Sequence, residues 1–444
     1  MTAMQEQQES AVGVIPAGWS IASLGDLGSC IRGVSYKPEH LMQKTGESVT
    51  TLLRSNNIKN DRVNFDDVQF VAGCKISEGQ LARPFDIAIC MSNGSKALVG
   101  KSGVITPAHL ARHPRLTVGA FCAIYRSPVQ YTAQIFKSQF FQSAIDVQLA
   151  GSAINNLKGS DIEGIRFPLP PHREQKAIAA ILTAVDEKLD VIARQIEATQ
   201  TLKQGLMQTL FSRGVGTQDA DGRWVSHAEF KDSELGLLPA AWTVVSVGDV
   251  CDVRGGKRLP KGESLTTENT GYPYVRVSDM YMGGVDTSNI LYVPAHLQPS
   301  IARYTISKDD IFISVAGTLG IVGVIPEELD GANLTENADK LTDIKISRDY
   351  LFHCLCSEPI QQAIAREATS NAQPKLALAR IRDFRFPLPP AAEQREIAAI
   401  LGAVDEKRGS LAAKHRHYQT LKRGLMQKLL TGEWRVKVDA EMAA

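Results

Sequence analysis

The stretch FPLPP at residues 167–171 returns unchanged at residues 386–390, and this repeat indicates how the chain is organised. The repeat continues past the prolines. Of the 48 positions from 167 to 214, about 27 are identical to the residues 219 places later. Self-similarity of this length indicates that the chain contains one structural plan twice.

A second repeat extends this plan outward. IPAGW at residues 15–19 returns as LPAAW at residues 238–242, a shift of 223 that differs by only four from the first shift. Each half therefore has a variable region of about 145 residues followed by a repeated block. Fainter echoes inside the variable regions align Arg32-Gly33 with Arg254-Gly255, and Arg54 with Arg276. This pattern predicts a shared fold with altered surface residues.

The repeated blocks predict long helices. Glu174 and Glu393 fall in the opening turns, where helix dipoles favour carboxylates. Apolar residues then recur at the three- and four-residue steps typical of a coiled-coil seam. The first seam comprises Ile178, Leu182, Val185, Leu189, Ile192, Ile196, Thr199, Leu202, Leu206 and Leu210, and the second comprises Ile397, Leu401, Val404, Leu411, Tyr418, Leu421, Leu425 and Leu429.

Arg408 and His415 interrupt the second seam. We interpret this interruption as a surface for another protein, although a self-contained packing stripe is the alternative. The first helix, from Glu174 to about Ser212, would measure roughly 58 Å at about 1.5 Å per residue.

The variable regions contain short β-branched runs such as 68–71, 87–90 and 311–315, cut by glycine, proline, asparagine and aspartate. Together with the blocks they predict an α+β fold, in which two mixed α/β domains are separated by two long helices in a pseudo-two-fold repeat. The expected segments are a first domain at 1–165, a central helix at 166–214, a linker at 215–237, a second domain at 238–384, a C-terminal helix at 385–432 and a tail at 433–444.

Composition narrows the class of protein. The 444 residues carry a formal net charge of +1, so any DNA binding must be local or shared with a partner. No apolar run reaches the length of a membrane helix, and the N-terminal MTAMQEQQES lacks the basic and then apolar pattern of a signal peptide, so we expect a cytoplasmic protein. The seven cysteines include no C-x-x-C pair, and we expect no metal site.

One segment resembles a catalytic motif. GSKALVGKS at residues 94–102 is similar to a phosphate-binding loop, but Val99 stands where the motif needs its second glycine. Dinucleotide-binding, nucleophile-elbow and zinc-helix motifs are absent from the sequence, as is the Asn-Pro-Pro-aromatic motif of adenine methyltransferases. We therefore predict no catalytic residue, and a nucleotide-hydrolysing enzyme remains as an alternative.

Both variable regions place basic and amide residues in glycine-rich loops. Arginine reads guanine and asparagine reads adenine through paired hydrogen bonds in the major groove. The candidate DNA contacts of the first region are Arg32, Tyr36, Lys37, Arg54, Asn56, Asn57 and Lys96, and those of the second are Arg254, Lys257, Arg258, Arg276, Ser278 and Thr318.

The repeated FPLPP followed by Glu174-Gln175 or Glu393-Gln394, together with FKDSELG at residues 230–236 and the closing LLTGEWRV at 429–436, resembles the specificity subunit of type I restriction-modification enzymes. The resemblance covers nearly the whole chain. It implies two target-recognition domains, each reading one half of a split, asymmetric site in double-stranded DNA, and two helices that pair antiparallel and hold the domains apart.

The resemblance also implies partners. These are two copies of an adenine-N6 methyltransferase subunit that uses S-adenosylmethionine, and a separate restriction subunit driven by ATP with Mg²⁺, so that this chain itself binds no cofactor. It assigns helix start and subunit contact to Pro170, Pro171, Glu174, Gln175, Pro389, Pro390, Glu393 and Gln394. A coiled-coil scaffold that binds proteins instead of DNA is the remaining alternative.

Overall fold

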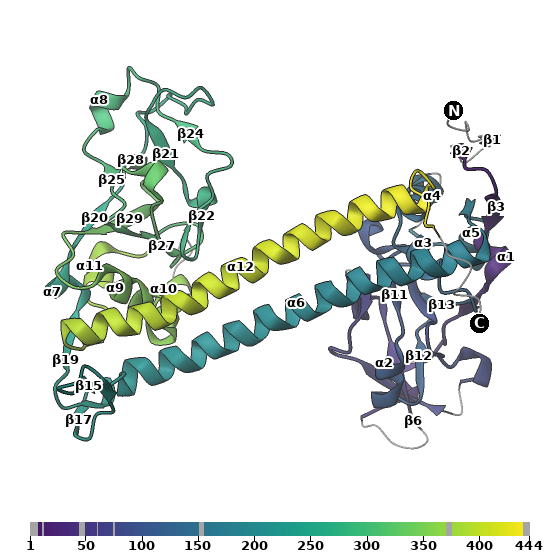
Figure 1. The fold of residues 1–444 in the computed structure, drawn as a ribbon, viewed down its shortest axis with the longest axis horizontal. Coiled ribbons are helices and arrows are strands. Elements are labelled where there is room, and N and C mark those ends of the chain that lie inside the picture. The colour runs from purple at the N-terminus through teal and green to yellow at the C-terminus, as the bar shows by residue number, and fades with distance from the viewer. Residues whose placement is uncertain are drawn as a thin grey trace. The chain divides into compact units, whose positions relative to one another are not determined.

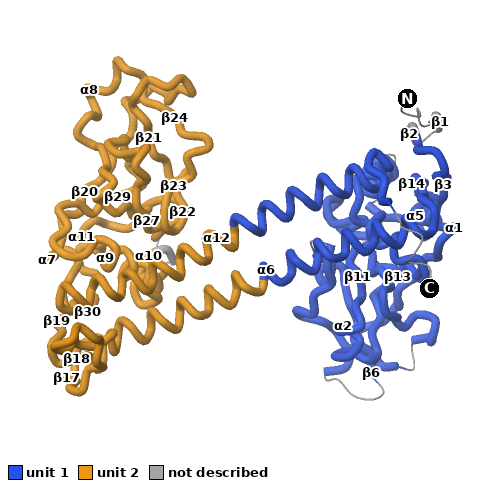
Figure 2. The backbone as a smooth tube through the Cα atoms, in the orientation of Figure 1, with its two compact units in different colours: residues 1–193, 413–444 blue, residues 194–412 orange. Residues whose placement is uncertain are grey.

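The computed structural model describes residues 8–10, 13–43, 49–59, 61–73, 76–150, 155–369 and 375–437. The chain forms two compact units of mixed helix and sheet (Figure 2). Unit 1 comprises residues 1–193 and 413–444, and unit 2 comprises residues 194–412. None of the described helices is long and apolar enough to cross a membrane.

Two long helices, α6 (His172–Arg213) and α12 (Ala391–Leu430), each contribute one part to unit 1 and the other to unit 2, as the colours of Figure 2 show. The expected segmentation treated each helix as a separate piece. The structure differs because the apolar faces of the helices pack into the cores of both units. Leu182 of α6 belongs to the unit 1 core, and Leu401 of α12 belongs to the unit 2 core.

Unit 1 is built on a six-stranded and a four-stranded sheet (Figure 1). The six-stranded sheet has the order β4 (Ser29–Arg32), β13 (Cys122–Arg126), β10 (Ile87–Cys90), β11 (Ser102–Val104), β8 (Arg62–Val63) and β7 (Ile58–Lys59). The four-stranded sheet has the order β12 (Leu116–Val118), β6 (Val49–Leu53), β9 (Gln69–Ala72) and β5 (Leu41–Met42). The remaining pairs are β3 (Ser20–Ser23) with β14 (Arg166–Leu169), and β1 (Gln8–Ser10) with β2 (Gly13–Ile15).

Unit 2 is built on two four-stranded sheets. The first has the order β20 (Asp252–Gly255), β29 (Ala338–Thr342), β26 (Ile311–Ser314) and β27 (Val322–Val324), and the second has the order β24 (Leu291–Tyr292), β21 (Pro273–Val275), β28 (Ala332–Leu334) and β25 (Thr305–Ile306). Two further pairs are β22 (Met280–Tyr281) with β23 (Gly284–Val285), and β19 (Thr243–Ser246) with β30 (Arg385–Leu388).

Shorter helices complete both units. In unit 1 they are α1 (Leu24–Leu27), α2 (Pro107–Arg112), α3 (Thr132–Phe136), α4 (Gln139–Ala150) and α5 (Gly159–Glu163), with 3-10 turns at η1 (Pro38–His40), η2 (Ser55–Asn57), η4 (Glu78–Gln80) and η5 (Lys96–Leu98). In unit 2 they are α7 (Val247–Val250), α8 (Gln298–Ile301), α9 (Arg348–Leu355), α10 (Glu358–Thr369) and α11 (Leu378–Arg382), with η6 (Val277–Asp279) and η7 (Glu327–Leu329).

The two units repeat one topology. The order β4-β13-β10-β11 in unit 1 corresponds to β20-β29-β26-β27 in unit 2, and the antiparallel registers match, with Ile87 opposite Tyr125 and Ile311 opposite Leu341. Both four-stranded partner sheets also contain one parallel pair, β6 with β12 and β21 with β28. The internal repeat in the sequence is therefore a repeat of fold.

The same registers correct one sequence echo. Arg32 lies opposite Ala123 and Gly255 lies opposite Asp339, so Arg32 is equivalent to Gly255 and not to Arg254. The next residues, Gly33 and Gly256, are then equivalent to each other. A Cβ added at either glycine would lie 2.1 Å from a backbone carbonyl oxygen. The chain passes so close to its neighbour at both places that only glycine fits.

The repeated FPLPP places the start of each long helix. In unit 1 the first three of these residues lie in β14, which pairs with β3, and in unit 2 the first three lie in β30, which pairs with β19. Phe167 and Phe386 are buried at these places. The two prolines then end each strand, and α6 and α12 begin at residues 172 and 391. The sequence placed the first helix at 174 to 212, and α6 extends two residues further at its start and one at its end.

The helices pair antiparallel inside each unit. In unit 2, Arg408 donates to Gln200 and Lys203 pairs with Asp405 at 2.7 Å, so three steps forward on α6 correspond to three steps back on α12. In unit 1, Lys422 pairs with Asp186 at 2.8 Å. The Lys203–Asp405 and Lys422–Asp186 pairs are equivalent in the repeat, since each residue has its counterpart 219 places away.

Most of the predicted seam is buried or half-buried, but two members are not. Leu202 is 56% exposed and Leu421 is 41% exposed. The neighbouring lysines turn inward instead, and Lys203 is buried against Asp405. Both leucines were wrongly placed in the seam, because an ion pair replaces an apolar contact at this level of each unit.

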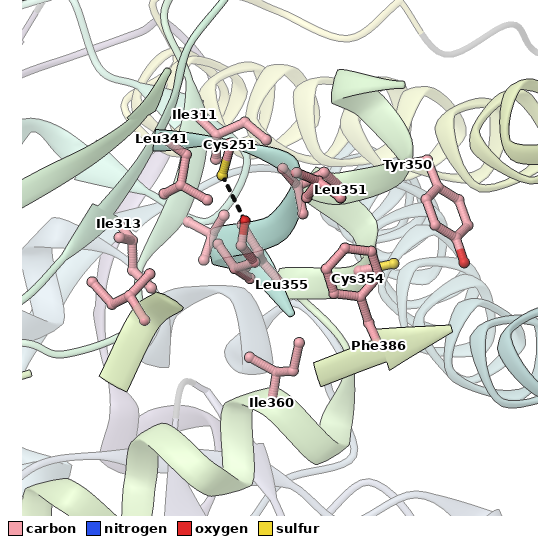
Figure 3. Packing of buried hydrophobic residues seen from close by; sticks show 14 of the residues in the cluster. Cys251, Ile311, Ile313, Leu341, Tyr350, Leu351, Cys354, Leu355, Ile360 and Phe386 are labelled. Carbon is pink, nitrogen blue, oxygen red and sulfur yellow. Dashed lines mark hydrogen bonds between the residues drawn. The ribbon is translucent and has the colours of Figure 1, made fainter. Parts of the chain in front are cut away.

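The core of unit 2 joins the sheet to the helices (Figure 3). Ile311 and Leu341 from adjacent strands pack with Leu351 of α9. The Cys251 thiol donates to the carbonyl of Val247 at 3.3 Å, and burial raises the pKa of this thiol to about 12. Such a thiol stays protonated and serves as a small apolar side chain.

The expected linker at 215–237 has structure of its own. It forms the hairpins β15 (Thr217–Gln218) with β16 (Trp224–Val225) and β17 (Phe230–Ser233) with β18 (Gly236–Pro239). Its first residues are tied to α12, because the amides of Val215 and Gly216 donate to a carboxylate oxygen of Glu393 at 2.9 and 3.0 Å.

Candidate nucleic-acid interface

Unit 1 gathers its glycine-containing loops at one end of its sheets. The Val34 amide donates to the carbonyl of Val118 at 2.8 Å, and the Gly119 amide donates to the carbonyl of Leu53 at 2.8 Å. The Asn93 side chain donates to the hydroxyl of Ser55 at 3.1 Å. These bonds bring together what we term the unit 1 loop cluster, residues 32–37, 54–57, 93–98 and 119–122.

Unit 2 repeats this arrangement. The Lys257 amide donates to the carbonyl of Leu334 at 2.8 Å, and the Thr335 amide donates to the carbonyl of Val275 at 3.1 Å. The Val315 amide donates to the carbonyl of Asn337 at 2.8 Å. The unit 2 loop cluster therefore comprises residues 255–261, 276–279, 316–320 and 335–339, together with Lys375, which forms a β-bridge with Ala316.

The predicted DNA contacts of unit 1 divide by exposure. Arg32, Lys37, Asn56 and Lys96 are exposed in the unit 1 loop cluster. Their donors and charges are available to an anionic or polar ligand, as phosphate and base-edge contacts require. The structure thus brings four predicted residues to one end of the unit.

Three other predicted residues of unit 1 are occupied by the fold. The Tyr36 hydroxyl donates to Gln69 at 2.6 Å, and the Arg54 guanidinium binds the carboxylate of Asp67 at 2.7 Å. Asn57 is fully buried, accepts from the Arg54 amide at 2.9 Å and donates to the carbonyl of Asp66 at 2.7 Å. The prediction that Asn57 contacts DNA is corrected, because both ends of its amide close the η2 turn.

The predicted residues of unit 2 are mostly exposed but partly paired. Arg254 lies 2.7 Å from Asp252, and Arg258 lies 2.6 Å from Glu336. Exposed ion pairs of this kind contribute little to stability, so a phosphate can replace the carboxylate. Lys257 lies over the ring of Tyr304, and Ser278 and Thr318 are exposed.

Arg276 is held more firmly. Its guanidinium makes two hydrogen bonds to the buried carboxylate of Asp279, at 2.6 and 2.9 Å. Asp279 also accepts from the Arg276 amide, as Asn57 does from Arg54. The aligned segments 54–57 and 276–279 are therefore the same turn, and the last side chain of each shapes the loop.

The residues expected to contact another subunit lie at the helix starts, and six of them are buried, Pro170 and Pro389 among them. Glu174, Gln175, Glu393 and Gln394 are each less than 9% exposed. Gln175 donates to the carbonyl of Pro170 at 2.7 Å, and Gln394 donates to that of Pro389 at 2.8 Å. The glutamines thus fix the diproline corners, while contact of these residues with a partner subunit stays a prediction.

Each glutamate ties three segments of the chain together. Glu174 accepts from the Trp19 indole at 3.0 Å and from the Arg435 guanidinium at 2.9 Å. Glu393 accepts from the Trp242 indole at 2.9 Å and lies 2.9 Å from the His227 ring. Burial alone would raise the pKa of Glu174, but the Arg435 and Trp19 hydrogen bonds outweigh it and hold this pKa below its ordinary value.

The loop that resembles a phosphate-binding motif lacks the geometry of one. A phosphate-binding loop opens an α-helix, whose first amides face the phosphates. Here residues 96–98 form the 3-10 turn η5, and the chain continues into strand β11. Within the described ranges, no group of three or more His, Cys, Asp or Glu residues is placed to hold a metal ion.

Comparison with known proteins decides between the remaining interpretations. The type I restriction-modification DNA specificity domain matches residues 128–200 and 239–416, which is more than half of the chain. The chain belongs to this family. It is a specificity subunit, which directs the methylase of a type I restriction-modification system to DNA sites and is not itself the catalytic subunit.

Relatives match this specificity subunit over nearly its whole length. The type I restriction enzyme EcoKI specificity subunit of Escherichia coli strain K12 is 28% identical over 96% of this chain and 92% of that protein. The StySPI specificity subunit of Salmonella potsdam is 27% identical over 97% and 92%. The crystal structure of the S subunit from M. genitalium covers 93% of this chain and 96% of that one, with 18% identity and a TM-score of 0.58, which shows a shared fold.

These findings confirm the resemblance seen in the sequence and do not favour a scaffold that binds only proteins. The geometry of this specificity subunit also adds residues that the sequence did not single out. Phe121 is 70% exposed in the unit 1 loop cluster, and Asn156 and Lys375 occupy equivalent exposed β-bridge positions beside the two clusters. Phe121 had no sequence signal, because the run VGAFCAIY at residues 118–125 reads as one buried strand.

Proposed function

We propose that this specificity subunit reads a two-part, asymmetric site in double-stranded DNA and directs a partner adenine-N6 methyltransferase to it. The unit 1 loop cluster would read one half of the site and the unit 2 loop cluster the other half. The chain itself would bind no cofactor, since S-adenosylmethionine belongs to the methyltransferase, and ATP with Mg²⁺ to a restriction subunit where one is present. Its work on DNA would take place in the cytoplasm.

The main support for this proposal is that the two units share one topology but differ in the side chains and loops of their loop clusters. At equivalent places of the repeated sheet, unit 1 has Arg32 where unit 2 has Gly255. The loop from Cys90 to Gly100 is four residues longer than its counterpart from Ser314 to Gly320, although both end in a bond back to the strand. Two readers of common design with unlike side chains would recognise two unlike DNA words.

The long helices would act as an antiparallel coiled coil that keeps the two readers at a fixed distance. Each helix is continuous, over 42 residues in α6 and 40 in α12, and the pairs formed inside each unit fix its register. A two-part site has a fixed spacing for the same geometric reason. Two copies of the methyltransferase fit this scheme, one for each half of the repeat.

The exposed Leu202 and Leu421 mark equivalent places on the helices where a partner would dock. Because the ion pair faces inward, the two leucine side chains expose apolar surface to solvent. Exposed apolar surface is typical of protein interfaces. The diproline corners with Glu174 and Glu393 would support this contact indirectly, by fixing where each helix begins.

A reconstitution experiment tests the proposal. The purified chain alone should neither methylate nor cut DNA, whereas addition of the methyltransferase subunit and S-adenosylmethionine should produce adenine methylation at a defined two-part sequence. Methyl transfer by the chain alone would contradict the proposal. A complex of the two subunits that shows no sequence-specific footprint would instead support the protein-binding scaffold.

A further inference from the structure

Asp339 is a buried carboxylate at the edge of the unit 2 loop cluster. It lies on β29, opposite Gly255 of β20 and Ile313 of β26, and only 5% of the residue is exposed. Within the described ranges of the chain, no hydrogen bond or ion pair joins the Asp339 side chain to another residue, and its carboxylate oxygens keep only a small contact with solvent. A largely buried carboxylate without protein donors is costly, because it has lost most of its water and no donor of the chain replaces it.

The other buried acids of the chain show how unusual this is. Asp86 pairs with Arg126 at 2.7 Å, and Asp310 pairs with Lys340 at 3.4 Å. Asp279, Glu174 and Glu393 are bound by Arg276, Arg435 and His227. Among the buried acids that the structure describes, Asp339 therefore stands apart in lacking a partner.

The surroundings of Asp339 leave it ready to receive a donor. Burial raises its pKa to about 6, while the charge of Lys375 acts in the opposite direction. The residue across the strand pair is Gly255, where an added Cβ would already lie 3.4 Å from a carboxylate oxygen of Asp339. Because glycine occupies that place, no side chain covers the carboxylate from β20.

The equivalent place in unit 1 has the opposite charge. There Ala123 takes the position of Asp339, and the exposed Arg32 takes the position of Gly255. One cross-strand pair therefore presents a hydrogen-bond donor in unit 1 and a hydrogen-bond acceptor in unit 2. A position that changes from donor to acceptor between two readers is suited to discrimination between bases.

We propose that Asp339 is a base-reading residue of unit 2, which accepts a hydrogen bond from the exocyclic amino group of a base, N4 of cytosine or N6 of adenine. This inference rests on the proposed function and adds one residue and one base chemistry to it. Carboxylates accept from the cytosine amino group in the major groove, and both amino groups offer the donor that Asp339 lacks. Lys375, exposed beside the carboxylate, would bind a nearby phosphate and help to keep Asp339 ionised.

The first test is Asp339→Asn, analysed in the full complex with the methyltransferase by mapping of methylated adenines. The amide keeps the shape but replaces one acceptor oxygen with a donor. We expect one position in the half read by unit 2 to relax or change, with about tenfold or more loss of discrimination there, while the half read by unit 1 stays unchanged. The matched control is Asp349→Asn, an exposed carboxylate of α9, which should leave the whole site unchanged.

A thermal unfolding midpoint no lower than that of the unchanged protein should accompany Asp339→Asn, since a neutral amide removes an unpaired buried charge. An active variant that methylates the original site with the original discrimination would overturn the assignment of Asp339. If the unchanged complex methylates no defined two-part site, the proposed function fails instead, so the two failures are distinguishable.

The second test needs no variant and therefore does not depend on how Asp339→Asn folds. Duplexes of the mapped site carry single N4-methylcytosine or N6-methyladenine substitutions, which remove the amino hydrogen that faces the major groove. One such substitution in the half read by unit 2 should weaken binding about tenfold, and its base identifies the donor. Equal binding of every substituted duplex in that half would overturn the proposal.

Discussion

Glu174 and Glu393 show how one residue performs the same structural task in both units with different partners. Each accepts a hydrogen bond from a tryptophan, Trp19 or Trp242. The third member is Arg435 from the C-terminal segment in unit 1 but His227 from the linker in unit 2. The end of the chain thus supplies to unit 1 what the linker supplies to unit 2.

This network predicts a pH-dependent loss of stability in Glu174→Gln. The pKa of Glu174 is lowered in the folded protein. The ionised carboxylate therefore contributes its full share of the unfolding free energy above the unfolded pKa of about 4.3. This contribution is lost as the pH falls through the folded pKa. We expect the variant to lose about 2 kcal/mol of unfolding free energy at pH 7, with a smaller loss below about pH 4. Urea denaturation at both pH values measures this.

The matched control is Glu187→Gln, because Glu187 is an exposed carboxylate of the same helix. It should change stability by less than about 0.5 kcal/mol at either pH. A loss in Glu174→Gln that is equally large in acid would show that packing, and not the ionised carboxylate, holds the three segments together.

The exposed cations of the loop clusters should separate into two classes. Lys257 is exposed, and we expect Lys257→Ala to weaken binding to all DNA sequences and to lower the salt dependence by about one unit. Arg32→Ala should instead relax one base position in the half read by unit 1. Binding titrations over a range of salt concentrations, with cognate and unrelated duplexes, distinguish the classes. Equal effects of the two variants on cognate and unrelated DNA would argue against base reading by Arg32.

The sequence predicted polar loops as DNA contacts, but it did not show which of their side chains are buried. Arg32 and Lys96 are exposed as a DNA contact must be, yet Asn57 closes a turn. An asparagine that caps a 3-10 turn and one that reads adenine look the same in one sequence, because the two differ in burial and burial is not visible there. Asp339 was missed for the opposite reason, since a single aspartate in a run of strand residues carries no signal until its partners are known.

At the scale of the elements, the two long helices followed from the sequence because the three- and four-residue spacing of apolar residues persists through both blocks. The exposure of Leu202 and Leu421 could not be predicted from the sequence. The apolar spacing assigns the buried position to the leucine and not to the lysine that follows it. The ion pairs Lys203–Asp405 and Lys422–Asp186 decide the orientation, and each stands at the same place of the repeat.

The helix pair predicts the result of a paired insertion. In the register set by Gln200 with Arg408, Ala198 lies opposite Ser410. Four residues inserted after Ala198 together with four inserted at Ser410 should add about 6 Å to both helices and rotate them by about 40°. The unread spacer of the DNA site should lengthen by about one or two base pairs of about 3.4 Å, with both recognised halves unchanged. Methylation mapping measures the spacer.

A single insertion in α6 serves as the control for that experiment. It should displace Lys203 from Asp405 and lower stability, because the opposing partners no longer meet. An active paired-insertion variant that keeps the original spacer would show that the helices do not set the distance between the two readers.

At the scale of the whole molecule, the internal repeat was the most informative feature of the sequence. It indicated two similar regions and two similar helices. The two units have matching strand orders. Because both variable regions build the same sheets, they have similar lengths although their residues differ. The division into compact units did not follow from the sequence, because the repeated blocks read as separate helices although their buried faces belong to the cores of both units.

We propose above all that each unit reads its own half of the site. The most direct measurement is the map of methylated adenines in cells that carry the methyltransferase and a chain whose residues 20–160 are replaced by the equivalent region of a relative. We predict that one half of the recognised site changes, while the other half and the spacer remain. A map in which both halves change, or in which neither does, would contradict it.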